Sequence, residues 1–349
     1  MYKGALIGFG AVAENGHVPA LLAKKDVFKI CAVAEPSEER RAAAERFFPG
    51  VRAYASLDAL LENEKHLDFA DIASPPVYHF SCIKKCLKAK LNVLCEKPLV
   101  FKHNDFAALA KLAAEKKRAL FTVHNWKYAP PMVKARELIE KGLAGNVLHV
   151  ELHVLRNQPS ITAGAASNWR HDPKLSGGGI MTDHGWHNFY LAYCLAKGRP
   201  VSITASFSYP ERNALQVEQS CSCQLEFLKD GSVNPVTAEI FLTWQSPVRK
   251  NWCAVYGTAG VIEIRDDIVI LERKGQPEQI FSTGEKLSGG SAHPTWMAGL
   301  LDEFARALAN PGSGTENLRE AEACVALLNA GYKSAKAGRR QAAGKLTFF

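Results

Sequence analysis

The chain of 349 residues is longer than one ordinary core requires, and at roughly 150 residues per domain we expect two domains. Hydrophobic residues make up 47% and charged residues 22%, which is typical of a folded chain and excludes a largely disordered one. A net charge of +8 spread over this length does not indicate a nucleic-acid partner.

The first 123 residues alternate short apolar runs with amphipathic runs, the pattern of a buried parallel sheet covered by helices. Strands are predicted at residues 5–8, 29–34, 51–54, 69–73, 92–95 and 120–123. Helices are predicted at residues 38–47, 57–61, 80–88 and 105–116, because apolar residues recur there at intervals of three and four. We therefore expect an α/β fold with a doubly wound parallel sheet in an N-terminal domain of residues 1–123.

The pattern changes after residue 125. A helix is predicted at 132–141, and a strand at 147–156 has Leu148, Val150, Leu152 and Val154 on one face. Further strands are predicted at residues 202–209, 220–227, 237–245, 252–256 and 261–271, followed by helices at 295–309 and 316–337. Because these strands follow one another without helices, they predict an open, mostly antiparallel sheet in an α+β domain of residues 124–349.

The segment Gly8-Phe9-Gly10-Ala11-Val12-Ala13 lies between the first predicted strand and a helix, and it matches the dinucleotide-binding fingerprint. In that motif the first glycine permits a tight turn, the second lets the backbone approach a pyrophosphate, and the helix N-terminus attracts its charge. The alternative is a turn that merely joins a strand to a helix. The cofactor contacts predicted here are Gly8, Gly10, Ala11 and Val12.

Glu35 follows the second predicted strand. A carboxylate at this point accepts hydrogen bonds from both ribose hydroxyls of the adenosine and repels a 2′-phosphate, so it favours NAD over NADP. Arg40 and Arg41 on the next helix argue weakly the other way, although arginines that face solvent are the simpler interpretation. We expect NAD as the cofactor.

Two further strand ends carry candidate cofactor residues, because ligands of open parallel sheets bind at the carboxyl ends of the strands. Ser74 and Pro75 end the fourth strand, and His79 follows near the start of a helix, where a surface position is its alternative. The fifth strand ends in Cys95-Glu96-Lys97-Pro98. A partly buried lysine there can orient or deprotonate a substrate hydroxyl, whereas a solvated loop lysine is the alternative. The bond before Pro98 is a candidate cis peptide bond.

The densest polar cluster of the second half follows the glycines at 177–179. Asp183 and His187 are four residues apart on a predicted helix, so they share a face and form a candidate acid/base pair. A metal site of Asp183, His184 and His187 is the alternative, but His184 is expected to point about 100° away from Asp183. His149 and His153 are explained by the polar face of a sheet, and we expect no metal.

The segment 157–176 is predicted to be a long loop, and long loops in compact domains often bind ligands. Within it Trp169 offers a ring on which a sugar can stack, and Arg170 offers a fork of hydrogen-bond donors. A tryptophan that attaches the loop to the core is an equally good interpretation.

Three motifs taken together resemble the glucose-fructose oxidoreductase and inositol dehydrogenase family (Gfo/Idh/MocA). They are Gly8-x-Gly10, Glu96-Lys97-Pro98, and the glycines at 177–179 leading into Asp183-x-Gly185-x-His187. The resemblance covers nearly the whole chain; Ala13 replaces the third glycine, which the family tolerates. It implies an N-terminal Rossmann domain and a C-terminal domain for substrate binding and oligomerisation, whose open sheet forms homodimers or homotetramers.

The resemblance also implies NAD(P)-dependent oxidation or reduction of a CH–OH group in a sugar, cyclitol or related polyol. In it Lys97 bonds the reacting hydroxyl, His187 is the general base or acid, and Asp183 orients the pair and the substrate. The remaining expected cofactor contacts are Glu96 and Asn125, and the expected substrate contacts are Lys127, Trp169, Arg170, Asp183 and His187. A nicotinamide-binding regulator without turnover, and a glycoside-processing enzyme that oxidises transiently with bound NAD, are the alternatives.

The cysteines and the first residues bear on location. Nine cysteines contain no Cys-x-x-Cys pair, so neither a zinc site nor a disulfide framework is indicated. The chain runs directly into its first predicted strand, and no apolar stretch reaches the length of about 18 residues that a membrane span needs. We expect a cytoplasmic protein without a membrane partner.

Overall fold

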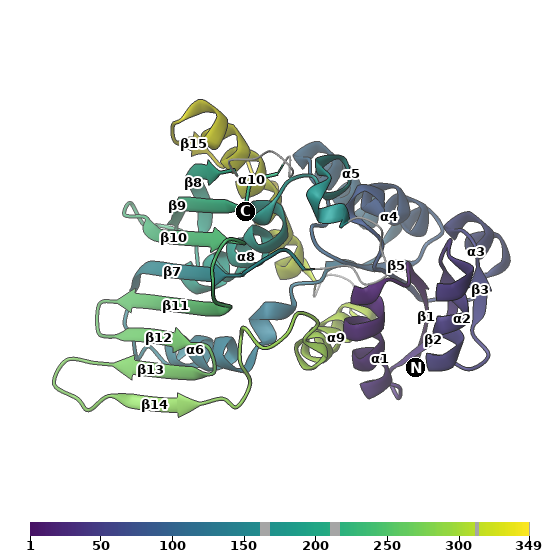
Figure 1. Ribbon diagram of the computed structural model, residues 1–349, viewed down its shortest axis with the longest axis horizontal. Coiled ribbons are helices and arrows are strands. Elements are labelled where there is room, and N and C mark those ends of the chain that lie inside the picture. The colour runs from purple at the N-terminus through teal and green to yellow at the C-terminus, as the bar shows by residue number, and fades with distance from the viewer. Residues whose placement is uncertain (161–167, 210–216, 311–313, 349) are drawn as a thin grey trace. The chain divides into compact units, whose positions relative to one another are not determined.

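The computed structural model describes residues 1–160, 168–209, 217–310 and 314–348. The chain forms two compact units, shown in Figure 1. The first comprises Met1–Asn125 and Ala292–Arg319, and the second comprises Trp126–Ser291 and Glu320–Phe349.

The first unit is a six-stranded parallel sheet in the order β3-β2-β1-β4-β5-β6. Its strands are β1 (Tyr2–Ile7), β2 (Phe28–Ala34), β3 (Arg52–Tyr54), β4 (Phe69–Ile72), β5 (Asn92–Cys95) and β6 (Leu120–Thr122). Its helices are α1 (Val18–Ala23), α2 (Glu38–Phe47), α3 (Leu57–Asn63), α4 (His79–Lys88), α5 (His103–Lys116) and α9 (Pro294–Ala309). The predicted doubly wound sheet is confirmed, and its order reverses between β1 and β4, where ligands of such sheets bind.

Helix α9 packs beside α1 in the first unit (Figure 1), whereas the predicted boundary after residue 123 assigns it to the second domain. The cause is an aromatic cluster around Phe304. Its ring stacks on Phe28 with the centroids 6.1 Å apart, and it meets Phe69 at 5.7 Å and Phe121 at 5.6 Å. Each of these rings is a strand residue of the sheet, so α9 covers an apolar surface that the first 125 residues leave open.

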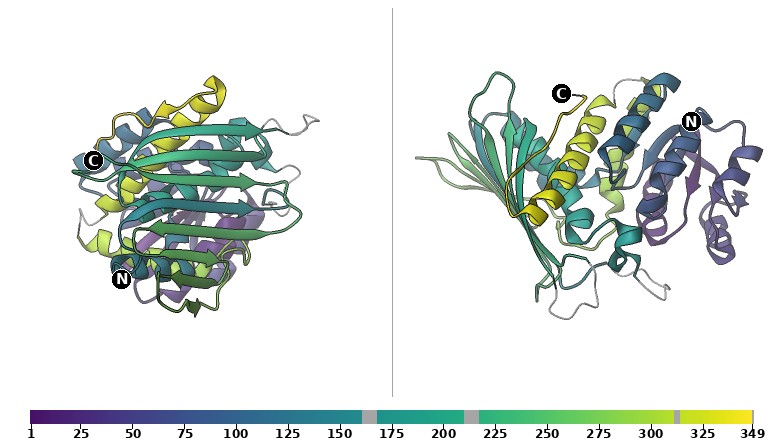
Figure 2. Two further views of the ribbon diagram at one scale, coloured as in Figure 1. Left: turned by 90° about the vertical axis from the view of Figure 1, so that its left-hand side faces the viewer. Right: turned by 90° about the horizontal axis from the view of Figure 1, so that it is seen from above.

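The second unit is built on a nine-stranded sheet in the order β14-β13-β12-β11-β7-β10-β9-β8-β15. Its strands are β7 (Val147–Leu155), β8 (Arg199–Ser208), β9 (Ser220–Leu228), β10 (Val236–Thr243), β11 (Lys250–Gly257), β12 (Val261–Arg265), β13 (Ile268–Glu272), β14 (Gln279–Ser282) and β15 (Gln341–Ala342). Its helices are α6 (Pro130–Glu140), α7 (Pro173–Ser176), α8 (Trp186–Ala196) and most of α10 (Thr315–Ala337). Figure 2 shows α8 and α10 on the same side of this sheet.

The sheet is mostly antiparallel, as predicted, except that β10 and β7 run parallel. The single strand predicted at 261–271 is wrong, because the chain reverses at Asp266, whose φ of 62° is left-handed, and forms the hairpin of β12 and β13. Strands β14 and β15 were not predicted. The face predicted for β7 holds for Val150, Leu152 and Val154, which are buried. Leu148 is exposed, because a register shift between Tyr256 and Gly257 leaves it outside the pairing.

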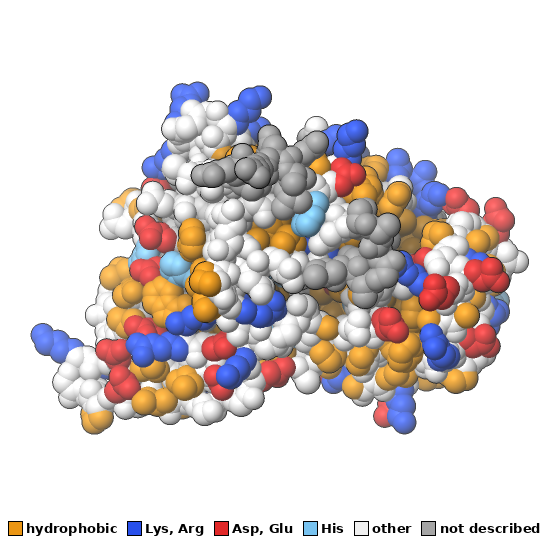
Figure 3. Space-filling model, in the orientation of Figure 1, with side chains coloured by type: hydrophobic (Ala, Val, Ile, Leu, Met, Phe, Trp, Pro, Cys, Tyr) orange, Lys and Arg blue, Asp and Glu red, His pale blue; other side chains and the backbone are white. Residues whose placement is uncertain are grey.

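The opposite face of the sheet carries the polar side chains of β7. The carboxylate of Glu151 lies 3.6 Å from Nε2 of His149 and 3.9 Å from Nε2 of His153. Histidine and acidic side chains gather over β7 and β10 at the left of Figure 3. Among the described residues, no group of three or more His, Cys, Asp or Glu side chains is arranged to hold a metal ion. Within the same residues, no helix combines the length and apolar character that crossing a bilayer demands.

Candidate functional site

The glycine turn of the first unit lies at the carboxyl end of β1. Gly8 has a φ of +88°, and a Cβ there would lie 2.9 Å from the backbone nitrogen of Ser74, so only glycine fits. A Cβ on Gly10 would meet nothing within 4 Å. The turn therefore leaves open space beside its second glycine, as the binding of a dinucleotide requires.

Glu35 is fixed to this turn. One oxygen of its buried carboxylate accepts the backbone N–H of Phe9 at 2.8 Å, and the other accepts the N–H of Ser37 at 2.9 Å. Arg41, which we expected to face solvent, instead donates to the carbonyl oxygens of Glu35 and Pro36, each at 2.7 Å. The end of β2 thus presents an anchored carboxylate with a guanidinium beside it.

A buried chain of three charged side chains, which the sequence interpretation missed, lies behind the glycine turn. His17 donates from Nδ1 to Asp71 of β4 at 2.8 Å and from Nε2 to Glu96 at 3.0 Å. We call these residues the His17 chain. His17 and Asp71 are at most 1% exposed. The ring reaches both acids because residues Ala13–His17 form a π-helical turn, a feature that occurs frequently at functional sites.

The charges of this chain support one another. Burial by itself lowers the pKa of His17, but Asp71 and Glu96 outweigh it and raise that pKa to about 10. Burial also tends to raise the pKa of Glu96, yet the His17 imidazolium and the backbone N–H of Lys97 lower it overall. At neutral pH the His17 chain therefore consists of one imidazolium between two carboxylates.

Lys97 leaves the end of β5 between two buried histidines. Its backbone N–H donates to Oε2 of Glu96 at 3.0 Å, and the Lys97–Pro98 bond is cis, as predicted. On the other side, the ring nitrogens of His79 lie 2.8 Å from the carbonyl oxygens of Pro98 and Ser74. The side chains of His79 and Glu96 thus hold the backbone around Ser74 and Lys97, and their contact with the cofactor stays a prediction.

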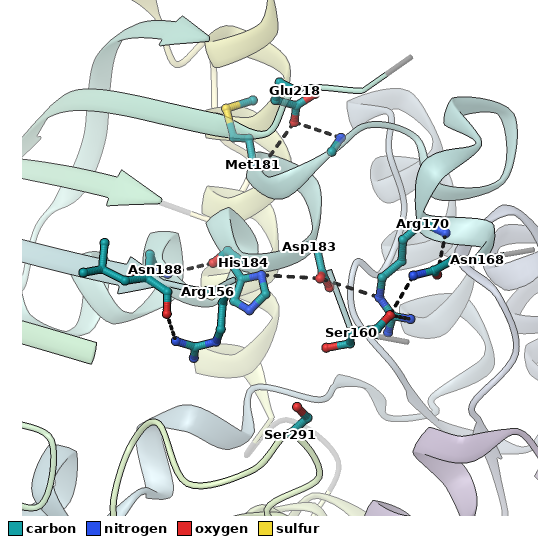
Figure 4. A network of polar contacts seen from close by, with 12 residues as sticks. Arg156, Ser160, Asn168, Arg170, Met181, Asp183, His184, Asn188, Glu218 and Ser291 are labelled. Atoms are coloured by element: carbon teal, nitrogen blue, oxygen red, sulfur yellow. Dashed lines mark hydrogen bonds and ion pairs between the residues drawn. The ribbon is translucent and has the colours of Figure 1, made fainter. Parts of the chain in front are cut away.

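The acid/base cluster of the second unit centres on Asp183 (Figure 4). Its Oδ2 lies 3.6 Å from Nε of Arg170 and 3.4 Å from Nδ1 of His184. The expectation that His184 points away from Asp183 is wrong. Residues Met181–Gly185 form a second π-helical turn, within which the side chains of Asp183 and His184 bend toward each other.

Glu218 holds the start of this helix. Its buried carboxylate accepts the N–H groups of Gly179 at 2.9 Å and Met181 at 3.1 Å, together with the hydroxyl of Tyr332 at 2.8 Å. Burial raises the pKa of Glu218, while these donors oppose the rise. A Cβ on Gly179 would overlap the carbonyl oxygen of Glu218, which explains a glycine there. The sequence interpretation missed Glu218.

His187, the predicted base, lies at the start of α8. Its Nδ1 is 2.9 Å from the hydroxyl of Tyr190, and its ring stacks on Trp126 with the centroids 4.6 Å apart. The same hydroxyl accepts the backbone N–H of Trp126 at 3.0 Å. Burial raises the pKa of Tyr190 well above its usual value, so this hydroxyl remains protonated. The structure thus orients His187 through a tyrosine that the sequence interpretation missed.

Four residues predicted to contact a ligand have the following surroundings. Lys127 is buried and donates to both oxygens of Glu320, at 2.9 and 3.0 Å, so an ion pair engages the side chain for which a substrate contact was predicted. The guanidinium of Arg170 lies 4.4 Å from the ring centre of Trp169 and covers one face of that ring. Oδ1 of Asn125 is buried and lacks a hydrogen-bond partner among the described residues, which leaves an acceptor for a ligand.

A six-stranded parallel sheet with a dinucleotide turn, joined to a second unit with a large mixed sheet, defines a Rossmann-type nucleotide-binding protein. The chain belongs to the Gfo/Idh/MocA oxidoreductase family. The family described as "Oxidoreductase family, NAD-binding Rossmann fold" matches residues 2–124, and the "GFO/IDH/MocA C-terminal domain" matches residues 132–263. The resemblance stated from the sequence is thereby confirmed.

Related proteins agree with this family. An uncharacterised oxidoreductase of Schizosaccharomyces pombe is 32% identical over 65% of this chain and 60% of its own length, so the chain spans about three fifths of that relative. Inositol 2-dehydrogenase of Corynebacterium glutamicum is 26% identical over 60% of this chain and 58% of its own. The structure of levoglucosan dehydrogenase with NADH and levoglucosan has a TM-score of 0.85 at 18% identity, covers 99% of this chain and 100% of its own, and shows the same fold.

Proposed function

We propose that this protein is an NAD-dependent dehydrogenase that transfers hydride between nicotinamide and a CH–OH carbon of a sugar, cyclitol or related polyol. The observation that carries the proposal is Lys97 at the carboxyl end of β5, in the unit that holds the glycine turn. Its backbone N–H is bonded to Glu96, and the carbonyl oxygen of the next residue, Pro98, is bonded to His79. The names of relatives, an inositol 2-dehydrogenase among them, support the substrate class.

The residues of the first unit fit a nicotinamide dinucleotide. The open space at Gly10 admits a pyrophosphate, the anchored carboxylate of Glu35 suits ribose hydroxyls, and Asn125 offers an unused acceptor. When bound, the nicotinamide accepts or supplies the hydride. We propose NAD rather than NADP, because a buried carboxylate at the end of β2 opposes a 2′-phosphate.

Lys97 and His187 have different roles at the substrate oxygen. The Lys97 ammonium donates a hydrogen bond to that oxygen and stabilises the negative charge that develops on it. His187 takes the hydroxyl proton during oxidation and returns it during reduction. In the oxidation direction the substrate carbon would become a carbonyl, and the hydroxyl proton would stay on the imidazole of His187.

Tyr190 selects the nitrogen of His187 that reacts. Its hydroxyl lies 2.9 Å from Nδ1 of His187 and also accepts the N–H of Trp126, so we assign the exchange of the proton with substrate to Nε2. Asp183 holds Arg170 and His184 beside this base and accepts a hydrogen bond from a neighbouring substrate hydroxyl. Trp169 and Arg170 contribute the adjoining surface.

The test is a panel of neutral polyols, inositols and keto-sugars mixed with the protein and NAD or NADH, followed by the absorbance of reduced nicotinamide. We expect turnover with at least one class and a loss of turnover in Lys97→Ala that leaves NAD binding intact. Lys102→Ala, which removes an exposed lysine of the same segment, is the matched control. Undiminished turnover in Lys97→Ala would remove the proposed role. The homodimer or homotetramer and the cytoplasmic location stay predictions.

A further inference from the structure

The His17 chain has features that packing alone does not require. Asp71 is a fully buried carboxylate within the otherwise apolar strand β4, and an unpaired charge in that position is costly. His17 compensates it, yet a buried ion pair is often no more stable than apolar residues of the same volume. Stability alone therefore does not explain why the protein keeps the buried charges of the His17 chain.

The chain ends at the residue to which we assign the reacting lysine. Oε1 of Glu96 receives the imidazolium N–H of His17, and Oε2 receives the backbone N–H of Lys97, each at 3.0 Å. With both oxygens engaged, the carboxylate cannot rotate without breaking one of two charge-assisted hydrogen bonds. The backbone N–H of Glu96 is also bonded, to the carbonyl oxygen of Ile72 at 2.8 Å. The orientation of the peptide that carries Lys97 thus depends on His17.

The chain also joins the lysine to the glycine turn. His17 lies at the end of the π-helical turn Ala13–His17, and this turn follows Gly10 directly, with Glu14 N–H bonded to the carbonyl of Gly10 at 3.0 Å. The charged groups that act on the ring are Asp71 from β4 and Glu96 from the end of β5, and Lys97 acts on Glu96 in turn. One imidazolium therefore connects the segment expected at the pyrophosphate with the segment expected at the substrate.

We propose that His17 is a positioning residue of the reaction, which, as an imidazolium between Asp71 and Glu96, fixes the peptide from which Lys97 reaches the substrate. The inference rests on the proposed function for the reaction itself. The effect of His17 on the position of Lys97 can be measured without turnover.

The first measurement is independent of activity. In the full-length protein, lysines are reductively methylated with ¹³C-formaldehyde, and the Lys97 signal is assigned by its absence in Lys97→Arg. We expect His17→Gln to shift this signal, because Glu96, which accepts the backbone N–H of Lys97, loses its charged partner. Glu96→Gln, which cannot accept from both His17 and Lys97, should produce a similar change. Nitrogen-15 spectra of the unmodified wild type should show both ring nitrogens of His17 protonated well above pH 7.

The second measurement uses turnover. His17→Gln should lower kcat on the order of tenfold to a hundredfold, the effect of a misplaced reacting group, while the Kd for NAD and the KM for polyol change less than about threefold. It should also change the pH dependence of kcat, because Glu96 loses the imidazolium that lowers its pKa. Ile83→Val, a change in the core of the same unit, is the control for lost stability and should leave the pH profile of kcat unchanged.

The outcomes separate the two claims. If no polyol is turned over but the Lys97 signal responds to His17→Gln, the proposed function fails and the positioning stands. If the Lys97 signal and the pH profile in His17→Gln equal those of the wild type, the inference is overturned. If His17→Gln does not fold, Asp71→Asn, which retains an acceptor for His17, serves in the same measurements with a smaller expected shift, and an unchanged Lys97 signal there overturns the inference as well.

Discussion

The hydroxyl of Tyr190 lies 2.9 Å from Nδ1 of His187 and accepts the backbone N–H of Trp126 on its other side. These bonds, with the stacking of Trp126 on the imidazole, hold the ring from one edge and one face. Both of these partners of the proposed base belong to the second unit.

Tyr190→Phe should reduce kcat by about fivefold to tenfold, since one net hydrogen bond is worth about 1 to 1.5 kcal/mol. The pH at which kcat falls on the acid side should also move, because Nδ1 loses its partner. Steady-state kinetics over pH 5 to 9 measures both, with Tyr78→Phe, an exposed tyrosine, as the control. Identical pH profiles in Tyr190→Phe and the wild type would contradict the role of the hydroxyl.

The stability of the protein should depend on pH through His17. Its pKa is about 10 in the folded protein and 6.5 as the ordinary value, so its contribution is complete below pH 6.5 and is lost as pH rises through about 10. The difference in free energy of unfolding between wild type and His17→Gln should therefore shrink from pH 6 to pH 10, by an amount on the order of a few kcal/mol. Urea unfolding at several pH values measures it, and a constant difference would contradict the raised pKa.

The cofactor preference should respond to Glu35. Replacing Glu35 by Ser removes the charge that opposes a 2′-phosphate and leaves Arg41 nearby, so the ratio of kcat/KM for NAD over NADP should fall by about tenfold or more. Glu38→Ser makes the same change of charge at an exposed position of α2 and should leave the ratio unchanged. Equal ratios in Glu35→Ser and Glu38→Ser would remove Glu35 from the adenosine site.

The ion pair of Lys127 and Glu320 should be structural. Lys127→Met leaves a buried carboxylate without its cation and should lower the free energy of unfolding by about 3 to 5 kcal/mol. The double variant Lys127→Met with Glu320→Leu should recover much of this loss, because no buried charge remains. Chemical denaturation compares the three proteins. Full stability in Lys127→Met, accompanied by a raised KM for polyol, would instead favour the substrate contact expected from the sequence.

The order of local patterns along the first 123 residues was sufficient to predict the parallel sheet, since each strand and helix buries its own apolar residues. The assignment of α9 could not be predicted in the same way. Its apolar face fits either unit, and only the cluster of Phe304 with Phe28, Phe69 and Phe121 shows which one it covers. Such contacts join segments that are far apart in sequence, and the periodicity of apolar residues within one segment does not indicate which distant segment it packs against.

The residues of the candidate site also fall into two groups, those that short motifs identify and those that depend on contacts between distant segments. Lys97, Asp183 and His187 are identifiable from short motifs, whereas their partners His17, Glu218 and Tyr190 depend on how the turns fold. One signal was available: Asp71 is an acid within an apolar strand, and such a residue needs a buried cation. The two π-helical turns were not predicted, because each is five residues long and too short to show a periodic pattern of its own.

The placement of α9 in the first unit has a consequence for biosynthesis. A ribosome that has released only the first 125 residues has produced a nucleotide-binding sheet with Phe28, Phe69 and Phe121 still uncovered. The helix that covers them is synthesised after all of β7 to β14. The first third of this chain is therefore synthesised long before the helix that completes its core, and strands β7 to β14 emerge in between. A fragment that stops at residue 125 should accordingly aggregate, whereas one in which 292–319 is attached directly to it should not.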